Sequence, residues 1–128
     1  MTRLREIVER PPVVAEAHES LSSVARRMHD HHVDSVVLLA EDATLTGILT
    51  ERDLVRACAA GVDTHRATVG RWMSRDLVTA HATDRAAAAL QRMIEHRIRH
   101  LPVLGQEGLI GVVSMGQLSR HLHTQRNG

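Results

Sequence analysis

The chain has 128 residues, enough for one compact domain with a core of its own but not for a second large domain. Its 16 basic residues, all arginine, nearly balance 15 acidic residues, which leaves a net charge of +1, and Trp72 is the only aromatic residue. This composition argues against a nucleic-acid-binding protein, which needs a concentrated basic face and often aromatic platforms, and no apolar run reaches the roughly 20 residues of a membrane-spanning helix.

The first ten residues carry charges of both signs and lack the apolar segment of a secretory signal peptide. The lone cysteine, Cys58, has no partner for an internal disulfide and cannot supply a multi-cysteine zinc site. We therefore expect a protein of the reducing cytoplasm, in which Cys58 is a small buried thiol.

The first half of the chain predicts a short strand, a helix, two strands and a final helix. The first predicted helix has a 3.6-residue apolar rhythm, and the final one stops at Gly61, because glycine adopts the left-handed helix-stop conformation at little cost. In chain order, these elements are the segment Val13–Ala15, a helix with Leu21, Val24, Ala25 and Met28 on one face, the strands Ser35–Ala40 and Leu45–Thr50, and the helix Glu51–Ala60.

A linker over residues 62–76 follows, in which Thr68 is a plausible cap for a single helical turn through Trp72. The second half then predicts the same element order. These elements are the segment Leu77–Ala80, a helix with Ala86, Leu90, Met93 and Ile94 on one face, the strands His100–Leu104 and Leu109–Ser114, and a closing helix.

The two halves are similar in sequence as well as in pattern. A shift of 65 residues matches Val13 with Val78, Ala15 with Ala80, Ala17 with Ala82, Arg27 with Arg92, Met28 with Met93, His31 with His96 and Leu39 with Leu104, and after one deletion a shift of 64 matches Leu45 with Leu109, Gly47 with Gly111, Leu54 with Leu118 and Arg56 with Arg120. We interpret the chain as two β-α-β-β-α repeats of an α+β fold, over residues 1–61 and 77–128, which need each other to bury their faces.

Charge is divided unevenly between the halves. Residues 1–64 hold 7 arginines against 11 acids, and residues 65–128 hold 9 arginines against 4 acids. Opposite charges of this kind favour attraction between the halves or between subunits.

Three phrases carry a resemblance to a known family. Residues 47–54 (GILTERDL) and their counterpart 111–118 (GVVSMGQL) each resemble the signature that closes a CBS domain, and residues 99–103 (RHLPV) add to the likeness. The chain thus resembles a tandem CBS-domain pair, or Bateman module, of the stand-alone two-CBS type over roughly residues 4–122. The resemblance implies two repeats related by pseudo-twofold symmetry, ligand clefts between them, often a homodimer, and binding of AMP, ADP, ATP or a related adenosyl ligand.

The resemblance also implies one complete nucleotide site with residues from both repeats. By this resemblance Thr50 and Asp53 would hold the ribose hydroxyls, since a carboxylate accepts two hydrogen bonds from neighbouring hydroxyls. Arg99 and His100 would face the phosphates, where the fork of an arginine suits phosphate oxygens. The adenine would lie between aliphatic side chains, namely Ile48, Leu77, Val78 and Ile98.

The mirror site departs from this pattern. Gln117 stands where the aspartate is expected after Ser114, and Asp34 with Ser35 stands in place of the basic pair. A carboxylate beside a phosphate is repulsive, and Gly116 loosens the first turn of that helix. We therefore predict one strong nucleotide per chain and a weak or empty second cleft.

Simpler interpretations remain open at each position. Thr50 with Asp53, and Ser114 with Gln117, both resemble capping boxes, which close a helix start without any ligand. Arg99 could be a solvated arginine paired with an acid, and we predict no structural metal despite ten histidines, because their spacing completes no obvious tetrahedral site.

The sequence thus favours a non-catalytic regulatory module, typical of energy sensing, in which nucleotide binding changes the repeat arrangement or the dimer and an unidentified protein partner reads that change. No catalytic constellation accompanies the expected cleft. The alternative is a ligand-free CBS module that serves for dimerisation or docking. A third, weaker hypothesis is metal or redox sensing by the histidines and Cys58.

Overall fold

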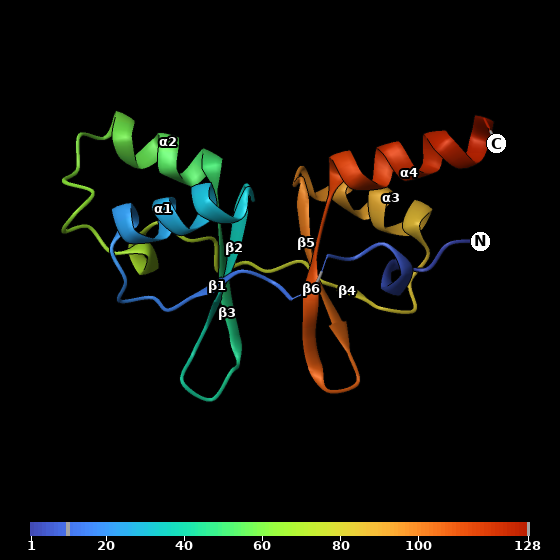
Figure 1. Ribbon diagram of the computed structural model, residues 1–128, viewed down its shortest axis with the longest axis horizontal. Coiled ribbons are helices and arrows are strands. Elements are labelled where there is room, and N and C mark those ends of the chain that lie inside the picture. The colour runs from blue at the N-terminus through green and yellow to red at the C-terminus, as the bar shows by residue number, and fades with distance from the viewer. Residues whose placement is uncertain (10, 128) are drawn as a thin grey trace. The chain divides into compact units, whose positions relative to one another are not determined.

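The computed structural model describes residues 1–9 and 11–127, with side chains described as far as residue 124. The chain divides into two compact units, one made of residues 13–77 and the other of residues 1–12 together with 78–128. Figure 1 shows that each unit has its own three-stranded sheet with two helices against it. The α+β fold class with two β-α-β-β-α repeats is confirmed.

In the unit of residues 13–77, two helices cover one face of the sheet in the order β1-β2-β3 (Figure 1). Strand β1 pairs with β2 in parallel, and β2 pairs with β3 in antiparallel fashion. The fully buried core comes from both helices, β2, β3 and the linker, and includes Leu21, Val24, Val36, Leu38, Leu49, Ala57 and Val69. The elements are β1 (Val14–Ala15), α1 (Leu21–His31), β2 (Ser35–Leu39), β3 (Leu45–Thr50), α2 (Glu51–Ala59) and the 3-10 helix η2 (Val69–Arg71).

The second unit repeats this arrangement with the strand order β4-β5-β6. Its core includes Leu4 from the N-terminal segment, which is as fully buried as Met93, Leu101 and Leu118. The elements are η1 (Leu4–Glu6), β4 (Ala80–His81), α3 (Ala86–His96), β5 (His100–Gly105), β6 (Gly108–Ser114) and α4 (Met115–Asn127).

The boundaries of the sequence repeats differ from those of the compact units. The predicted boundaries assign residues 1–61 to the first repeat and residues 62–76 to a linker. In the structure, residues 1–12 pack with the second repeat, and the linker packs with the first. The two segments are counterparts, because η1 and η2 are related by the same 65-residue shift as α1 and α3.

Two glycines allow these segments to approach the sheets. The backbone of Ser74 exchanges two hydrogen bonds with Ile48, at 2.9 and 3.1 Å, and Glu9 forms the corresponding bridge with Val112. A side chain on Gly47 would collide with Met73, and one on Gly111 would collide with the carbonyl oxygen of Glu9. Glycine is therefore needed at both positions to let a second backbone pass.

The predicted element ends agree with the structure within one to three residues, and the helix stops show the repeat again. Gly61 adopts a φ of +77° after α2, as expected. Helices α1 and α3 are each followed by a left-handed capping residue with a φ of 56°, His32 and Arg97, which are 65 residues apart. The structure thus reproduces the internal repeat in backbone conformation at positions where the side chains differ.

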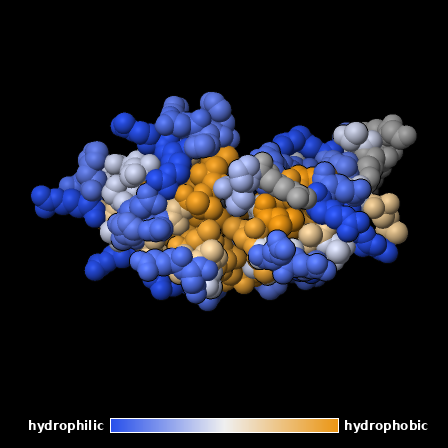
Figure 2. All heavy atoms as spheres, turned by 60° about the horizontal axis from the view of Figure 1, so that its bottom comes forward, coloured by the Kyte–Doolittle hydropathy of each residue, from blue (hydrophilic) through white to orange (hydrophobic). Residues whose placement is uncertain are grey.

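Polar side chains cover much of the visible face of each unit, and apolar surface is exposed on each as well (Figure 2). Cys58 is exposed, so the prediction of a buried thiol is wrong; the position follows Ala57, which faces the core, and lies on the outer side of α2. Of the helices in the described part of the chain, none is both long and apolar enough to cross a membrane.

Candidate functional site

The turn from β3 into α2 holds a buried carboxylate. The Asp53 side chain accepts a hydrogen bond from the backbone amide of Thr50 at 2.9 Å, and a second from the Thr50 hydroxyl at 3.3 Å, both at Oδ2. Its other oxygen, Oδ1, accepts from Nη1 of Arg56 at 2.9 Å. Asp53 is only 6% exposed, so these three bonds supply the partners that a buried carboxylate requires.

This arrangement confirms the capping interpretation of Asp53 and shows what a ligand would have to change. The bond from the Thr50 hydroxyl is the longest of the three, and a hydroxyl rotates freely to a new acceptor. A carboxylate has about four lone-pair sites, so Asp53 keeps acceptor capacity beyond its three present donors. The turn can therefore offer acceptors to hydroxyl groups without loss of the cap or of the Arg56 ion pair.

The matching turn from β6 into α4 has the same backbone design and a different charge. Gln117 Oε1 accepts from the amide of Ser114 at 2.8 Å, and the amide of Gln117 donates to the Ser114 hydroxyl at 3.1 Å. These two reciprocal bonds form a complete capping box. The group at the helix start is a neutral amide, so this turn lacks the charge that strengthens hydrogen bonds to a ligand hydroxyl.

Arg99 and His100 lie beside that second turn, within their own unit. The carbonyl of Arg99 accepts from the amide of Met115 at 2.7 Å, and His100 is the register partner of Ser114. The Arg99 side chain is exposed, and among the described side chains it has no ion-pair partner. In the first unit, the equivalent contacts join Asp34 to Glu51 and Ser35 to Thr50.

The four predicted adenine contacts are all at least half buried. Ile48 is 9% exposed and forms the backbone bridge with the linker, and Leu77 is half-buried at the end of that linker. Val78 and Ile98 pack against the core of the second unit and are partly buried. Aliphatic surface is thus present at each of these positions.

The predicted site draws residues from both units. One unit contributes Ile48, Thr50, Asp53 and Leu77, and the other contributes Val78, Ile98, Arg99 and His100. The first unit brings Thr50 and Asp53 into direct contact, and in the second Ile98 and Arg99 lead directly into β5, which begins at His100. The crossed site itself stays a prediction.

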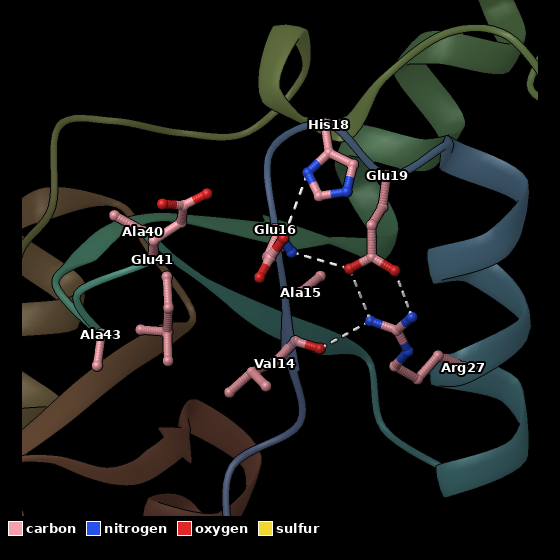
Figure 3. A pocket seen from close by; sticks show the side chains of 10 residues that line it. Val14, Ala15, Glu16, His18, Glu19, Arg27, Ala40, Glu41 and Ala43 are labelled. Carbon is pink, nitrogen blue, oxygen red and sulfur yellow. Dashed lines mark hydrogen bonds and ion pairs between the residues drawn. The ribbon is translucent and has the colours of Figure 1, made fainter.

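The sequence analysis missed an ion pair that holds the turn after β1. Arg27 on α1 donates from Nη1 to Glu19 at 3.0 Å and to the carbonyl of Val14 at 2.8 Å, and its Nη2 also contacts Glu19 (Figure 3). Glu19 accepts from the amide of Glu16 at 2.9 Å in addition. The side-chain hydrogen bond from Arg27 is the main reason that the pKa of Glu19 lies below its ordinary value.

The second unit contains the same device, built from Arg92 and Asp84. Arg92 Nη1 lies 3.2 Å from Asp84 and 2.9 Å from the carbonyl of Thr79, and Asp84 accepts from the amide of His81 at 2.9 Å. The His81 amide and then Arg92 hold the pKa of Asp84 below its ordinary value. Both pairs are related by the 65-residue shift of the repeat. The sequence signal that could have predicted them is an acid and an arginine that recur together at matched positions of the two repeats.

Among the cavities of the described residues, two are lined only by the unit of residues 13–77, and the lining of neither includes Thr50 or Asp53. One, of about 450 Å³, lies beside the Arg27–Glu19 pair and is lined by acidic and small side chains, among them Glu16 and Glu41 (Figure 3). The other, of about 650 Å³, is lined by the linker. Among the residues whose placement is described, no group of three His, Cys, Asp or Glu side chains could hold a metal ion.

Comparison with known proteins gives consistent matches over the length of the chain. The family model described as "CBS domain" matches twice, over residues 4–60 and 69–124. Hypoxic response protein 1 of Mycobacterium tuberculosis is 32% identical over 123 residues, which cover 95% of this chain and 86% of that protein.

Solved structures extend the likeness to the fold. A crystal structure of Hypoxic Response Protein I with two coordinated zinc ions has a TM-score of 0.80 at 30% identity and covers 94% of this chain and 98% of that one. The CBS domain protein PAE2072 from Pyrobaculum aerophilum, complexed with AMP, has a TM-score of 0.84 at 27% identity and covers 96% of this chain and 99% of that one.

Proposed function

The chain belongs to the CBS-domain family and carries two copies of the domain, and from this premise we propose that it is a non-catalytic regulatory module that binds an adenine nucleotide between its repeats. The observation that carries the proposal is the buried Asp53 carboxylate at the β3–α2 turn, which retains acceptor capacity for hydroxyl groups. The similar protein PAE2072 is complexed with AMP, which supports an adenosyl ligand.

The chemistry of the remaining residues suits the other parts of a nucleotide. The adenine would lie between aliphatic surfaces, because the chain has no phenylalanine or tyrosine to stack on it. These surfaces would come from Ile48, Leu77, Val78 and Ile98. Arg99 offers an exposed guanidinium without an ion-pair partner among the described side chains, and His100 follows it on β5. Both would meet the phosphates of AMP, ADP or ATP.

The same reasoning makes the mirror cleft the weaker one. Gln117 is neutral and already bonded to Ser114 in both directions, so it has less to offer a ribose than Asp53 has. Asp34 would bring a negative charge to the phosphate position, where it repels the ligand. We therefore propose one strongly bound nucleotide per chain.

Regulation requires that the nucleotide prefers one arrangement of the repeats or of a homodimer over another. A ligand shifts such an equilibrium only by the difference between its affinities for the two states. We propose that a cytoplasmic protein partner reads the favoured state, in the manner of an energy sensor.

Titration calorimetry with AMP, ADP and ATP tests the proposal. The expected result is one nucleotide per chain for the wild type, and an affinity about 10- to 100-fold lower for Asp53→Asn, because a charged acceptor contributes roughly 1.5–3 kcal/mol per hydrogen bond. Glu51→Gln is the matched control, since it removes an exposed carboxylate from the same first turn of α2. Equal affinities for Asp53→Asn and the wild type would refute the role of Asp53.

One observation favours the alternative of a ligand-free interaction module. Both helix-start turns satisfy their own hydrogen bonds, so neither depends on a ligand for stability. This alternative predicts no heat from any of the three nucleotides and an oligomeric state, measured by light scattering, that nucleotides leave unchanged.

A further inference from the structure

The linker encloses a second cavity, apart from the β3–α2 turn, whose walls combine positive charge with an aromatic ring. It has a volume of about 650 Å³ and is lined by residues between Val62 and Trp72. Pockets that bind small molecules typically have roughly 300–1,000 Å³ and join apolar walls to a few polar groups. Val62 and Ala67 supply apolar surface here, and both are half-buried against the core.

Two arginines carry the charge of this cavity. Arg71 is exposed, and its side chain forms neither an ion pair nor a hydrogen bond with any described residue. Arg66 lies 3.9 Å from Asp63 with its side chain 90% exposed, a separation and exposure at which an ion pair has little strength. Both guanidinium groups therefore remain able to bind an anion.

Asp63, the one acidic residue in the lining of this cavity, already forms hydrogen bonds within the loop. Asp63 Oδ1 accepts from the amide of His65 at 3.0 Å, and the carbonyl of Asp63 accepts from the amides of Arg66 and Ala67 at 3.0 and 2.8 Å. These bonds give Asp63 a structural role at the start of the turn. With two arginines against one acid, the cavity keeps a net positive charge.

Trp72 adds a flat apolar wall, and a third arginine lies over it. The Arg56 guanidinium carbon lies 5.6 Å from the centre of the Trp72 ring, within cation–π distance. Thr68 also lines the cavity, and its hydroxyl does not cap the 3-10 helix that follows. An oxyanion donor set and an aromatic surface are thus present in one concave region.

We propose that this linker cavity is a binding site for a small molecule that carries a phosphate or carboxylate group next to an apolar or planar group. Arg66 and Arg71 bind the oxyanion, with the Thr68 hydroxyl as a further donor, because the planar fork of arginine matches oxyanion geometry. Trp72, with Val62 and Ala67, contacts the apolar part. Neither Thr50 nor Asp53 lines this cavity, although Arg56, which lies over Trp72, is also the ion-pair partner of Asp53.

Trp72 makes the site directly observable. It is the only aromatic residue of the chain, so all intrinsic tryptophan fluorescence comes from the wall of this cavity. Phenyl phosphate is a suitable probe because it joins a planar ring to an oxyanion. The expected result is a saturable change of Trp72 fluorescence, with which inorganic phosphate competes and which weakens as salt is added.

Variants separate the role of the arginines from a general effect of charge. Arg71→Gln and Arg66→Gln are each expected to weaken phenyl phosphate binding about tenfold, since a charge-assisted hydrogen bond is lost. Arg26→Gln, which removes an exposed arginine of α1 outside the cavity lining, is expected to bind like the wild type. All three side chains are exposed, so the variants should fold, and circular dichroism checks this.

Three results would overturn the assignment. One is an affinity for phenyl phosphate that is the same in Arg71→Gln, Arg66→Gln and the wild type. The second is equal binding of phenol, which has the ring without the oxyanion. The third is loss of the response in Arg99→Gln, because Arg99 belongs to the proposed nucleotide site and does not line this cavity, so its loss would assign the signal to that site.

Discussion

In both units an arginine of the first helix holds the turn that precedes that helix, Arg27 through Glu19 and Arg92 through Asp84. The two units differ at the turn after the last strand, where Asp53 carries a buried charge and Gln117 carries a neutral amide. Contacts that support the backbone are thus repeated, while the side chains suited to a ligand differ. The two repeats are therefore more alike in the contacts that support the backbone than in the side chains that could bind a ligand.

The largest expected effect on stability comes from replacing Gly111 or Gly47, which leave room for the backbone segments that contain Glu9 and Ser74. Gly111→Ala should destabilise the protein by about 3 kcal/mol, because the new methyl group meets the backbone oxygen of Glu9. Gly47→Ala should cost about 1 kcal/mol, because its nearest obstacle is the flexible Met73 side chain. Urea denaturation measures both, and a larger loss for Gly47→Ala would contradict the asymmetry.

The next effect concerns the turn at which the units differ. The double variant Gln117→Asp with Asp34→Arg should raise the affinity of the proposed mirror cleft about 10- to 100-fold, because it supplies an acceptor charge and removes a repulsive one. Calorimetry should then detect two nucleotides per chain. Gln106→Asp, an exposed change in the β5–β6 turn, is the control and should leave one. An unchanged stoichiometry in the double variant would contradict the proposal that Gln117 and Asp34 make the mirror cleft the weaker one.

A smaller effect is expected from the shared arginines. Arg27→Ala and Arg92→Ala should each cost about 1 kcal/mol, since both pairs are partly exposed and solvent screens them. Arg27 should cost slightly more, because two of its nitrogens contact Glu19, whereas one nitrogen of Arg92 contacts Asp84. Arg26→Ala on the exposed side of α1 provides the baseline in the same denaturation series.

The smallest effect is the pH dependence of these two acids. The folded pKa values of Glu19 and Asp84 lie below the ordinary 4.5 and 3.8, so their stabilisation is present above those values and is lost as pH falls through the lowered ones. The loss should be less than about 1 kcal/mol for each, because both carboxylates are partly exposed.

Melting temperatures measured between neutral pH and the acid range check this. The double variant Glu19→Gln with Asp84→Asn should lose less stability on acidification than the wild type does. An equal or steeper loss in the variant would mean that other carboxylates account for the acid sensitivity.

The sequence by itself determined the repeat, the element order and the fold class. Apolar periodicity around Met28 and Met93 depends on helix geometry alone, and a stop such as Gly61 depends on one residue's backbone freedom. Local patterns of this kind act over a few residues and are readable without the rest of the chain. The capping of Asp53 was likewise foreseen as one of two interpretations, since it spans three residues.

Only the tertiary structure decided which segment packs against which repeat. Residues 1–12 pack with the second repeat and the linker packs with the first, because Gly111 and Gly47 leave room for a second backbone beside the strand. No local sequence pattern predicts this packing. The Arg56 contact with Trp72 and the exposure of Cys58 also depend on how α2 packs against the core and the linker. Such contacts join residues far apart in the chain, and their free energy depends on geometry that only the folded protein has.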